Sequence, residues 1–521
     1  MTTEQKDFRP WVVYVVCLGV ALVFMFFFGL NSPLHTFNSH CDYQWYMTMG
    51  RGMASGKVIY RDLFDHKGPI VYTMFAFACL FPNPQFVIWC IEVLCVSWFL
   101  DYCYRIARKF LSPWLSLLIV PLMMMALSSN YVRGIEGSCV EEYCLPVFAY
   151  ALLCFLDFLL DRKPATWRCS LTLGVLMGVL FWTKYTMLEF FIIPLLIWVV
   201  VQIVEHKFLV VVRSGFIMLG GFVLVTLPVI VVFAALGALD DLWQVYFMVN
   251  LGSYTGDYEN GVEVSYQNPW SSFGQSFLLC AYFGVLLLFG VVCFAVAHWR
   301  RKSGWLLLIA VLPTWLLVGF ICGYVYYYLP LYAYLTLGMV YVVKLIAQML
   351  QKADIKIQRT RAKVIGLIVT MVLSCLTAIP FVENISEINR PREVYAPLQV
   401  ADIIAEYNQT ATQPATLFCY RMGDGGFYNA AGIVPNVKYY AQSSFTETSF
   451  PEMFASFDQT IAEQRCDFVV TYRATFERNH KFLLTYYHPY FNNDLDASSI
   501  SYDFYEPGDY YYNTIVILYR N

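Results

Sequence analysis

Charged side chains are scarce in this chain. They make up 14% of its 521 residues, whereas soluble domains carry about 25%. A soluble globular protein is therefore excluded for most of the chain. Basic residues are not in excess either, because the formal net charge is −3. The sequence has no basic patch interleaved with aromatic residues, so nucleic acid is excluded as a partner.

The sequence also lacks cysteine pairs with the CxxC spacing typical of zinc sites, although it contains 16 cysteines. Most of them lie inside apolar runs, where Cys behaves as a small hydrophobic residue. Cys419 and Cys466 are the exceptions in the polar C-terminal part, and both a disulfide and two free thiols are open there. Internal repeats and low-complexity tracts are absent from the sequence.

Apolar residues make up 59% of the chain, and its mean hydropathy is +0.55. The first apolar run, Trp11 to Leu30, is long enough to span a bilayer, and no small-residue cleavage site follows it. We therefore expect an anchor and not a removable signal peptide.

Basic clusters between the apolar runs predict the orientation, because Lys and Arg gather on the cytoplasmic side. Those clusters lie at residues 6–9, 105–109, 162–168, 206–213, 300–302 and 352–363. The remaining connections then face outward: residues 31–68, 128–142, a tight turn at 184–189, residues 237–272 and 322–327, and everything after Pro380. One apolar piece, 69–81, is too short to cross and ends at Pro82-Asn83-Pro84, so we expect a re-entrant or interfacial helix there.

The predicted fold class is an α-helical polytopic membrane protein with about eleven spans and one re-entrant or interfacial helix. Residues 1–380 form the expected transmembrane domain, and residues 381–521 form a small extracytoplasmic α/β domain. In the latter, strand-like runs at 416–420, 467–472 and 514–519 alternate with helical segments at 398–407 and 451–464.

Charged and aromatic side chains converge on the predicted outer face from separate loops. The candidates are Asp42, Arg61, Asp65, His66 and Lys67 in the first loop, Arg133, Glu136, Glu141 and Glu142 in the second, Lys184 and Glu189 at the next turn, and Tyr327 at the head of a later span. Charges beside lipid cost free energy unless they are paired or hydrated, so such a cluster indicates a functional site.

Each candidate also has a purely structural explanation. Asp42 and Asp65 can be solvated loop acids or helix caps, and Glu141 and Glu142 can charge the start of a helix, where the dipole favours acids. Lys184 can extend to the interface, and the tyrosines can form an aromatic belt. His66 can be a neutral loop histidine, because the spacing of the nearby histidines does not define a metal site.

The first loop resembles that of bacterial GT-C glycosyltransferases, the polytopic enzymes that include aminoarabinose transferase and protein mannosyltransferases. The matching residues are Asp42, the run Gly56-Lys57-Val58-Ile59-Tyr60-Arg61-Asp62, and Asp65-His66-Lys67-Gly68-Pro69. The resemblance departs in the second outer loop, where relatives often carry a lone Asp and this chain has Glu136 and Glu141-Glu142.

The resemblance implies an inverting transfer of a sugar from a polyprenyl-phosphate carrier to a glycan, lipid or protein acceptor outside the bacterial cytoplasmic membrane. Asp42 is the implied base, with Glu141 or Glu142 as further catalytic candidates. Lys67 is the implied phosphate ligand, assisted by Arg61 or Arg133, with Asp65, His66, Lys184 and Tyr327 also placed at the carrier. Membrane lipids surround the spans.

Two alternatives and one cofactor stay open. A transporter or flippase of lipid-linked saccharides would place polar groups near mid-bilayer and show paired repeats, whereas this chain gathers its charges at one face. A sensor or assembly protein would need fewer spans. Asp42 with Glu136 or Glu142 could ligate Mg²⁺ or Mn²⁺ through oxygen atoms, although Lys67 can neutralise the phosphate without a metal.

Overall fold

The structure is a computed structural model in full side-chain detail. It describes residues 7–128, 139–161, 165–252, 281–301, 303–321, 325–352, 360–379, 385, 387–443, 445–490, 495–496 and 514–520. Two of the candidates, Arg133 and Glu136, lie outside these described residues.

The chain forms two compact units, each assembled from several segments. The helical unit consists of residues 1–32, 89–227 and 268–386, and the sheet unit consists of residues 33–88, 228–267 and 387–521. The first loop and the C-terminal part therefore belong to one unit. The domain division expected at residue 380 stays a prediction.

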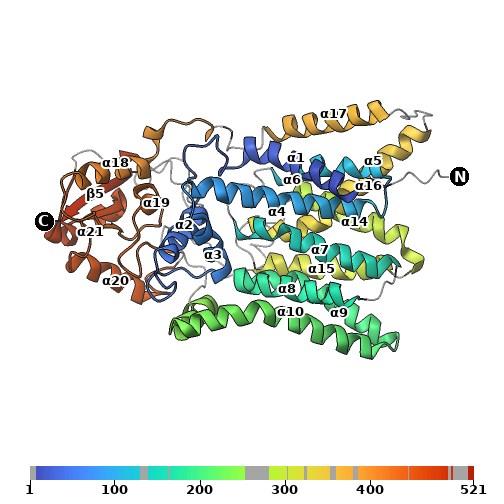
Figure 1. Cartoon of the computed structure of the whole chain (residues 1–521), viewed down its shortest axis with the longest axis horizontal. Helices are drawn as coiled ribbons and strands as arrows, with labels where there is room; N and C mark the ends of the chain where they lie inside the picture. Colours follow the sequence, from blue (N-terminus) through green and yellow to red (C-terminus); the bar gives the residue numbers. More distant parts are fainter. Residues whose placement is uncertain are drawn as a thin grey trace. The chain divides into compact units, whose positions relative to one another are not determined.

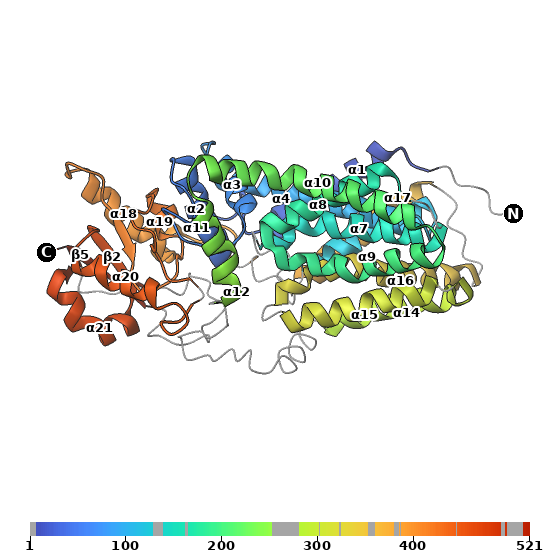
Figure 2. The ribbon, with the colours of Figure 1, turned by 90° about the horizontal axis from the view of Figure 1, so that it is seen from below.

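The helical unit is a bundle whose helices lie side by side with roughly parallel axes (Figure 1, Figure 2). Its members are α1 (Pro10–Phe28), most of α4 (Pro84–Ala107), α5 (Pro113–Leu117), α6 (Ile119–Leu127), α7 (Val140–Asp161), α8 (Trp167–Lys184), α9 (Glu189–Val204), most of α10 (Phe208–Ala235), α14 (Ala281–Ala297), α15 (Ser303–Ile321), α16 (Tyr332–Lys352) and α17 (Thr360–Ala378). Short 3₁₀ helices join some of them, among them η1 (Tyr185–Leu188), η3 (Trp299–Arg301) and η4 (Val325–Leu331).

Seven helical segments in the described residues are long and apolar enough to cross a membrane, and four shorter apolar helices accompany them. These apolar helices confirm the polytopic α-helical fold class, although seven segments of the described residues, and not about eleven, have the length and hydropathy of a membrane span. The predicted turn after α8 is confirmed as well. Lys184 has an extended backbone (φ −161°, ψ 99°) and η1 follows it. Cys169 near the start of α8 and Trp198 near the end of α9 line one cavity, so the chain reverses there.

Two glycines allow α8 and α10 to approach closely. A Cβ atom on Gly174 would come within 2.0 Å of the Met218 carbonyl oxygen, and one on Gly221 within 2.5 Å of the Leu171 carbonyl oxygen. Small residues at a crossing bring backbones together, which is how helices associate where water provides no driving force.

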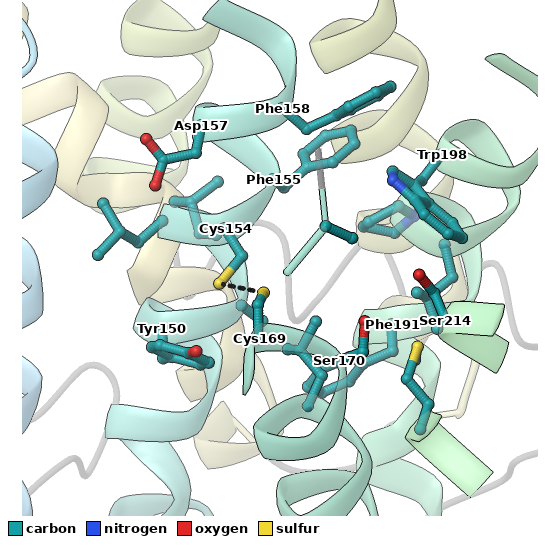
Figure 3. A pocket seen from close by; sticks show the side chains of 18 of the residues that line it. Tyr150, Cys154, Phe155, Asp157, Phe158, Cys169, Ser170, Phe191, Trp198 and Ser214 are labelled. Carbon is teal, nitrogen blue, oxygen red and sulfur yellow. Dashed lines mark hydrogen bonds between the residues drawn. The ribbon is translucent and has the colours of Figure 1, made fainter. Parts of the chain in front are cut away.

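A cavity of about 300 Å³ lies between α7, α8 and α9 in the helical unit (Figure 3). Its walls are mainly apolar and aromatic, with Tyr150, Phe155, Phe191 and Trp198 among them. Cys154 and Cys169 face each other across it with a sulfur–sulfur distance of 3.4 Å. Both cysteines are free thiols.

The sheet unit begins with two helices of the first loop, α2 (Cys41–Ala54) and α3 (Pro69–Ala78), which pack against each other. A Cβ atom on Gly50 would lie 2.6 Å from the Phe75 Cβ atom, so glycine is needed at this contact. The α3 helix occupies the segment where a short non-crossing helix is expected, and Pro69 starts it at N1, where a missing N–H costs nothing.

The C-terminal part of the sheet unit contains a five-stranded sheet with the order β1-β2-β5-β3, in which β4 also pairs with β5. The strands are β1 (Leu417–Cys419), β2 (Phe468–Tyr472), β3 (Tyr487–Pro489), β4 (Leu495–Asp496) and β5 (Thr514–Arg520). The β1–β2 pair is parallel and the others are antiparallel.

Helices cover both faces of this sheet. Tyr407 of α18 (Ala396–Asn408) packs on Phe468, while Phe457 of α20 (Pro451–Ala462) packs on Phe418. Phe468 and Phe418 are not register partners, because Phe418 pairs with Val469, so they point to opposite faces. Figure 1 shows α18 and α20 on either side of β5. Together the helices and strands confirm the small α/β part of the predicted fold class.

The other elements of this unit are α11 (Leu239–Leu242), the π-helical turn η2 (Trp243–Val249), α12 (Asn250–Gly252), η7 (Arg392–Val394), α19 (Phe427–Ala431) and α21 (Arg473–Tyr486). Cys419 and Cys466 are both buried free thiols, so the disulfide left open by the sequence is not formed.

Candidate functional site

The run Asp65-His66-Lys67, directly before α3, forms a connected set of side chains. The Asp65 Oδ1 atom lies 3.3 Å from His66 Nδ1, and the Lys67 Nζ atom lies 3.3 Å from His66 Nε2. Asp65 and His66 are buried, with exposed fractions of 4% and 5%, whereas Lys67 is half-buried. The structure thus places a cation at the partly open end of a buried acid–imidazole pair.

The backbone of this run is fixed by three surrounding side chains. The Tyr72 hydroxyl donates to Asp65 Oδ2 at 2.6 Å and accepts the Lys67 N–H at 2.9 Å. The Tyr60 hydroxyl donates to the Lys67 carbonyl at 2.6 Å, and the Asn250 amide donates to the His66 carbonyl at 2.8 Å. Buried polar groups that are satisfied in this way have one arrangement of lowest energy.

Tyr60 holds this position with an unusual backbone. Its φ is +71°, a left-handed conformation that is uncommon for a residue other than glycine. Its ring is buried and stacks on Phe233 with the ring centroids 5.6 Å apart. Backbone strain of this kind persists where the surroundings fix the residue, and it gathers at functional sites.

The charges of the run shift the pKa values of its members. Burial and the Lys67 charge lower the His66 pKa, and they outweigh the opposing effects of Asp65 and Asp42. Burial raises the Asp65 pKa, but the hydrogen bonds from His66 and Tyr72 and the nearby Lys67 charge outweigh burial, so the Asp65 pKa is lowered. At neutral pH the Asp65 side chain is therefore a carboxylate and the His66 imidazole is neutral.

Asp42 belongs to the same electrostatic cluster. It lies in the first turn of α2, where the helix dipole favours an acid, and it is half-buried. Its negative charge acts on His66 as well as on Cys41, so the side chain lies near the run of Asp65 to Lys67. The structure accordingly brings Asp42, Asp65, His66 and Lys67 together in the sheet unit.

A loop of the C-terminal part attaches to the helix that carries Asp42. The Thr48 hydroxyl of α2 donates to Asp424 Oδ2 at 2.5 Å, and the Gly426 N–H donates to Asp424 Oδ1 at 2.9 Å. Asp424 is fully buried, and burial raises its pKa to about 6. The glycine-rich run 423–426 therefore contacts α2 through Asp424.

Arg61 makes contacts apart from the cluster just described. Its guanidinium pairs with the neighbouring Asp62 at 3.1 Å and donates to the Leu236 carbonyl at 3.0 Å, and its side chain is 44% exposed. The sequence gives Asp62 no such role, and here it also accepts the Val58 N–H at 2.7 Å.

A second set of candidates meets in the helical unit. Lys184 forms a 2.5 Å ion pair with Glu141, and its ammonium lies 3.3 Å from the centroid of the Tyr327 ring. Glu141 is 2% exposed and Glu142 is fully buried. Glu189, at the start of α9, is also buried. Glu141 of α7, Lys184 of α8 and Tyr327 of η4 are therefore neighbours, although they lie far apart in the sequence.

The described residues do not offer a metal site. Within the ranges given above, no group of three or more His, Cys, Asp or Glu side chains has an arrangement that could hold a metal ion. We therefore derive no step through Mg²⁺ or Mn²⁺. Glu136, a proposed partner of Asp42 in such a site, is outside the described residues.

A polar cavity lies beside the residue that precedes Asp65. It has a volume of about 420 Å³, and its walls include Phe64, Asp240, Asp241, Gln244, Lys438 and Glu452. The π-helical turn Trp243–Val249 forms one wall, and such turns are frequent at functional sites. The cavity and the Asp65–Lys67 run share the sheet unit.

This fold is that of the GT-C glycosyltransferases, as the resemblance of the first loop predicts. The family model described as dolichyl-phosphate-mannose-protein mannosyltransferase matches residues 66–233, a stretch that starts within the Asp65–Lys67 run. No curated protein is significantly similar in sequence to the chain.

Solved structures of aminoarabinose transferase, ArnT, from Cupriavidus metallidurans have the same fold over nearly the whole length of both chains. The form bound to undecaprenyl phosphate is 15% identical, with a TM-score of 0.60 and coverage of 97% of this chain and 98% of that one. The apo form is 14% identical, with a TM-score of 0.58 and 97% coverage of each chain. At this identity the likeness establishes the fold.

Proposed function

We propose that this chain is a multi-pass glycosyltransferase of the bacterial cytoplasmic membrane that takes a sugar from a polyprenyl-phosphate carrier and transfers it to an acceptor on the outer side. The observation that carries the proposal is the Lys67 ammonium group, fixed at the end of the buried Asp65–His66 pair. It occurs in a chain with the fold of a protein solved with undecaprenyl phosphate.

Lys67 is suited to the phosphate of such a carrier. It lies two residues before Pro69, the first residue of α3, so the positive end of the helix dipole adds to the ammonium charge. When the sugar departs, negative charge develops on the phosphate oxygen. A preorganised cation there stabilises the transition state more than the ground state.

Asp42 is suited to the role of general base. In the proposed step the acceptor hydroxyl oxygen forms a bond to the anomeric carbon while the bond from that carbon to the phosphate oxygen breaks. The bonding pair leaves with the phosphate, and the hydroxyl proton passes to the Asp42 carboxylate. A single displacement of this kind inverts the anomeric centre. Asp42 and Lys67 belong to one electrostatic cluster, as both act on His66.

The acceptor is expected to be polar, because the cavity beside Phe64 has four charged side chains in its walls. The helical unit holds the remaining candidates. Lys184, which is paired with Glu141 and lies against the Tyr327 ring, stays a candidate contact for the carrier lipid, and Glu142 stays a further catalytic candidate.

Binding of undecaprenyl phosphate to the full-length chain in lipid nanodiscs tests this proposal, with undecaprenol as the matched lipid without phosphate. We expect the wild-type protein to prefer undecaprenyl phosphate. Lys67→Met should lose that preference, because it keeps the length of the side chain and removes the charge. Lys57→Met, which removes a cation of the same loop, serves as the control and should keep the preference.

Equal binding of the two lipids by the wild-type protein would contradict the proposal. Equal loss in the Lys57 and Lys67 variants would contradict the role of Lys67, because it would indicate a general effect of loop charge and not a specific phosphate contact.

A further inference from the structure

Asp65 is buried, and both of its carboxylate oxygens contact neighbouring groups of the first loop. Its Oδ1 atom accepts the His66 backbone N–H at 2.8 Å and lies 3.3 Å from His66 Nδ1, while its Oδ2 atom accepts the Tyr72 hydroxyl at 2.6 Å. Both carboxylate oxygens are thus occupied, and the residue is 4% exposed. The Asp65 carboxylate contacts the neighbouring imidazole of His66.

The Asp65 carboxylate determines which ring nitrogen of His66 carries the proton. We assign the proton to Nδ1, because this nitrogen faces the Asp65 carboxylate at 3.3 Å, and Nε2 then keeps its lone pair. The Lys67 ammonium lies 3.3 Å from that lone pair and can donate to it. One of the three ammonium hydrogens is then directed toward His66, and the direction of the other two is fixed as a result.

We propose that Asp65 and His66 are positioning residues that hold the Lys67 ammonium group in place for the phosphate of the carrier lipid. This inference rests on the proposed function, and it assigns His66 the role of a hydrogen-bond acceptor and not that of a base. A lysine side chain has much rotamer freedom, so a fixed acceptor reduces the entropy lost when the phosphate binds.

The pH dependence of binding follows from the groups that face His66. Among the described residues they include Asp65 and Lys67 in the same run, Asp42 of α2, and on the other side the Ser443 hydroxyl at 3.5 Å and the Phe445 ring. The imidazole is neutral at neutral pH because burial and Lys67 lower its pKa. Protonation of Nε2 in acid would abolish the acceptor and place a second cation against Lys67. Binding should therefore weaken as the pH falls through the lowered pKa of His66.

Two substitutions of His66 separate its two nitrogen positions. A glutamine can place its Oε1 atom where Nε2 lies, so His66→Gln keeps the acceptor for Lys67. An asparagine reaches the Nδ1 position instead, so His66→Asn keeps the partner for Asp65 and loses the acceptor. In nanodiscs with undecaprenyl phosphate, we expect His66→Asn to weaken binding about tenfold and His66→Gln by roughly threefold or less, the scale of one hydrogen bond to a charged group.

The loss of binding affinity as the pH falls, called here the acid limb, provides a readout that a purely structural role of His66 would not change. In His66→Gln the contribution of His66 should be missing, because glutamine does not titrate, and only the titration of the lipid phosphate, whose second pKa is about 6, should remain. Asp65→Asn keeps the shape of the carboxylate. It removes the negative charge that favours the protonated form of the His66 imidazole. That variant should bind more weakly and move the acid limb to lower pH.

The outcomes distinguish this inference from the function on which it rests. If wild-type protein binds undecaprenyl phosphate no better than undecaprenol, both are overturned. If it does bind the phosphate lipid, but His66→Asn and His66→Gln behave alike or His66→Gln keeps the wild-type acid limb, only the positioning role is overturned. If His66→Asn does not fold, Asp65→Asn decides: an unmoved acid limb overturns the inference.

Discussion

The Thr48 hydroxyl of α2 donates a 2.5 Å hydrogen bond to Asp424, a residue 376 positions further along the chain. The Arg51 guanidinium donates to the Asn429 side-chain oxygen at 2.6 Å, and the Asn429 amide donates to the Gln44 side-chain oxygen at 3.0 Å. Together these contacts attach the helix that carries Asp42 to the C-terminal part of the chain. The position of the proposed base therefore depends on residues far from it in sequence.

Asp424→Asn should stabilise the protein at neutral pH. Burial raises the Asp424 pKa from its ordinary 3.8 to about 6. A raised folded-state pKa means that the stability contributed by this group is fully present below the unfolded pKa and is lost as the pH rises through 6. Removal of the charge should then add up to about 3 kcal/mol at pH 8 and little at pH 4. Thermal unfolding in detergent at both pH values measures this.

Asp402→Asn is the control for that comparison, because Asp402 is 63% exposed and pairs with Arg392 at the surface. Its unfolding temperature should differ little from that of the wild type at either pH. A lower stability of Asp424→Asn at pH 8 would show that the charged form of Asp424 is the favoured one, contrary to the direction of the pKa shift.

Asp42→Asn should abolish transfer and keep donor binding. A general base contributes typically 10²–10⁴-fold to a rate, so we expect a loss of at least about a hundredfold in transfer from a labelled polyprenyl-phosphate sugar. The affinity for undecaprenyl phosphate should be unchanged within about twofold, since the phosphate contact is assigned to Lys67. The same Asp402→Asn control should keep full activity. Undiminished transfer by Asp42→Asn would exclude it as the base.

Removal of either partner of the Lys184–Glu141 ion pair should destabilise the protein. Glu141 is 2% exposed and the Lys184 side chain is 12% exposed, so the remaining partner would be a buried unpaired charge. Such a loss typically costs about 3–5 kcal/mol. We expect Lys184→Met and Glu141→Gln each to lower the unfolding temperature markedly, and the double variant to recover part of the loss. Additive losses in the double variant would contradict a coupled pair.

The positions of the helices along the chain could be predicted from the sequence, because hydropathy is a local property. The seven long apolar segments and the shorter apolar helices follow the apolar runs, and the break at Lys184 follows from a charged residue inside an apolar stretch. Strands β1, β2 and β5 could be predicted equally well, since their apolar residues are continuous and flanked by turns. The helix α21 was missed because Arg473–Tyr486 is polar on most of its surface, and its first half gives little periodic signal.

The site could be predicted only in part from the sequence. The Asp65–Lys67 run stands out by its charge, but the role of His66 depends on which ring nitrogen faces which neighbour, and that is set by Tyr72 and by burial. Asp424 could not be found, because nothing local connects a turn residue at 424 with Thr48. The hydrogen bond from Arg61 to the Leu236 carbonyl could not be predicted for the same reason, because Leu236 lies at the end of a helix far along the chain.

Gly50→Ala should disturb the contact between α2 and α3. A Cβ atom at Gly50 would lie 2.6 Å from the Phe75 Cβ atom and 2.7 Å from the Ala76 backbone nitrogen, and backbone atoms cannot move aside cheaply. Overpacking of this kind costs about 1–3 kcal/mol. Gly215→Ala in α10 is the matched control, since nothing lies within 4 Å of its Cβ position. We expect a lower unfolding temperature for the first variant and an unchanged or higher one for the second, whose helix propensity improves by about 1 kcal/mol.

The proposed orientation can be measured on intact bacterial cells with a membrane-impermeant maleimide. Lys481→Cys lies on the exposed surface of α21, and Lys207→Cys lies in the exposed connection between α9 and α10. We expect the first to be labelled in intact cells and the second only after lysis, with labelled peptides identified by mass spectrometry. Labelling of Lys207→Cys alone in intact cells would reverse the topology and exclude an outer site.

The sheet unit is assembled from three separated segments of the chain, 33–88, 228–267 and 387–521. During synthesis the ribosome makes the Asp42 helix early and makes strand β5, which lies at the centre of the sheet, almost last. The contacts of the first loop with the C-terminal part can therefore form only after the segments 228–267 and 387–521 have been made. If the proposed function holds, a chain that stops before β5 would lack a complete sheet unit and should be inactive.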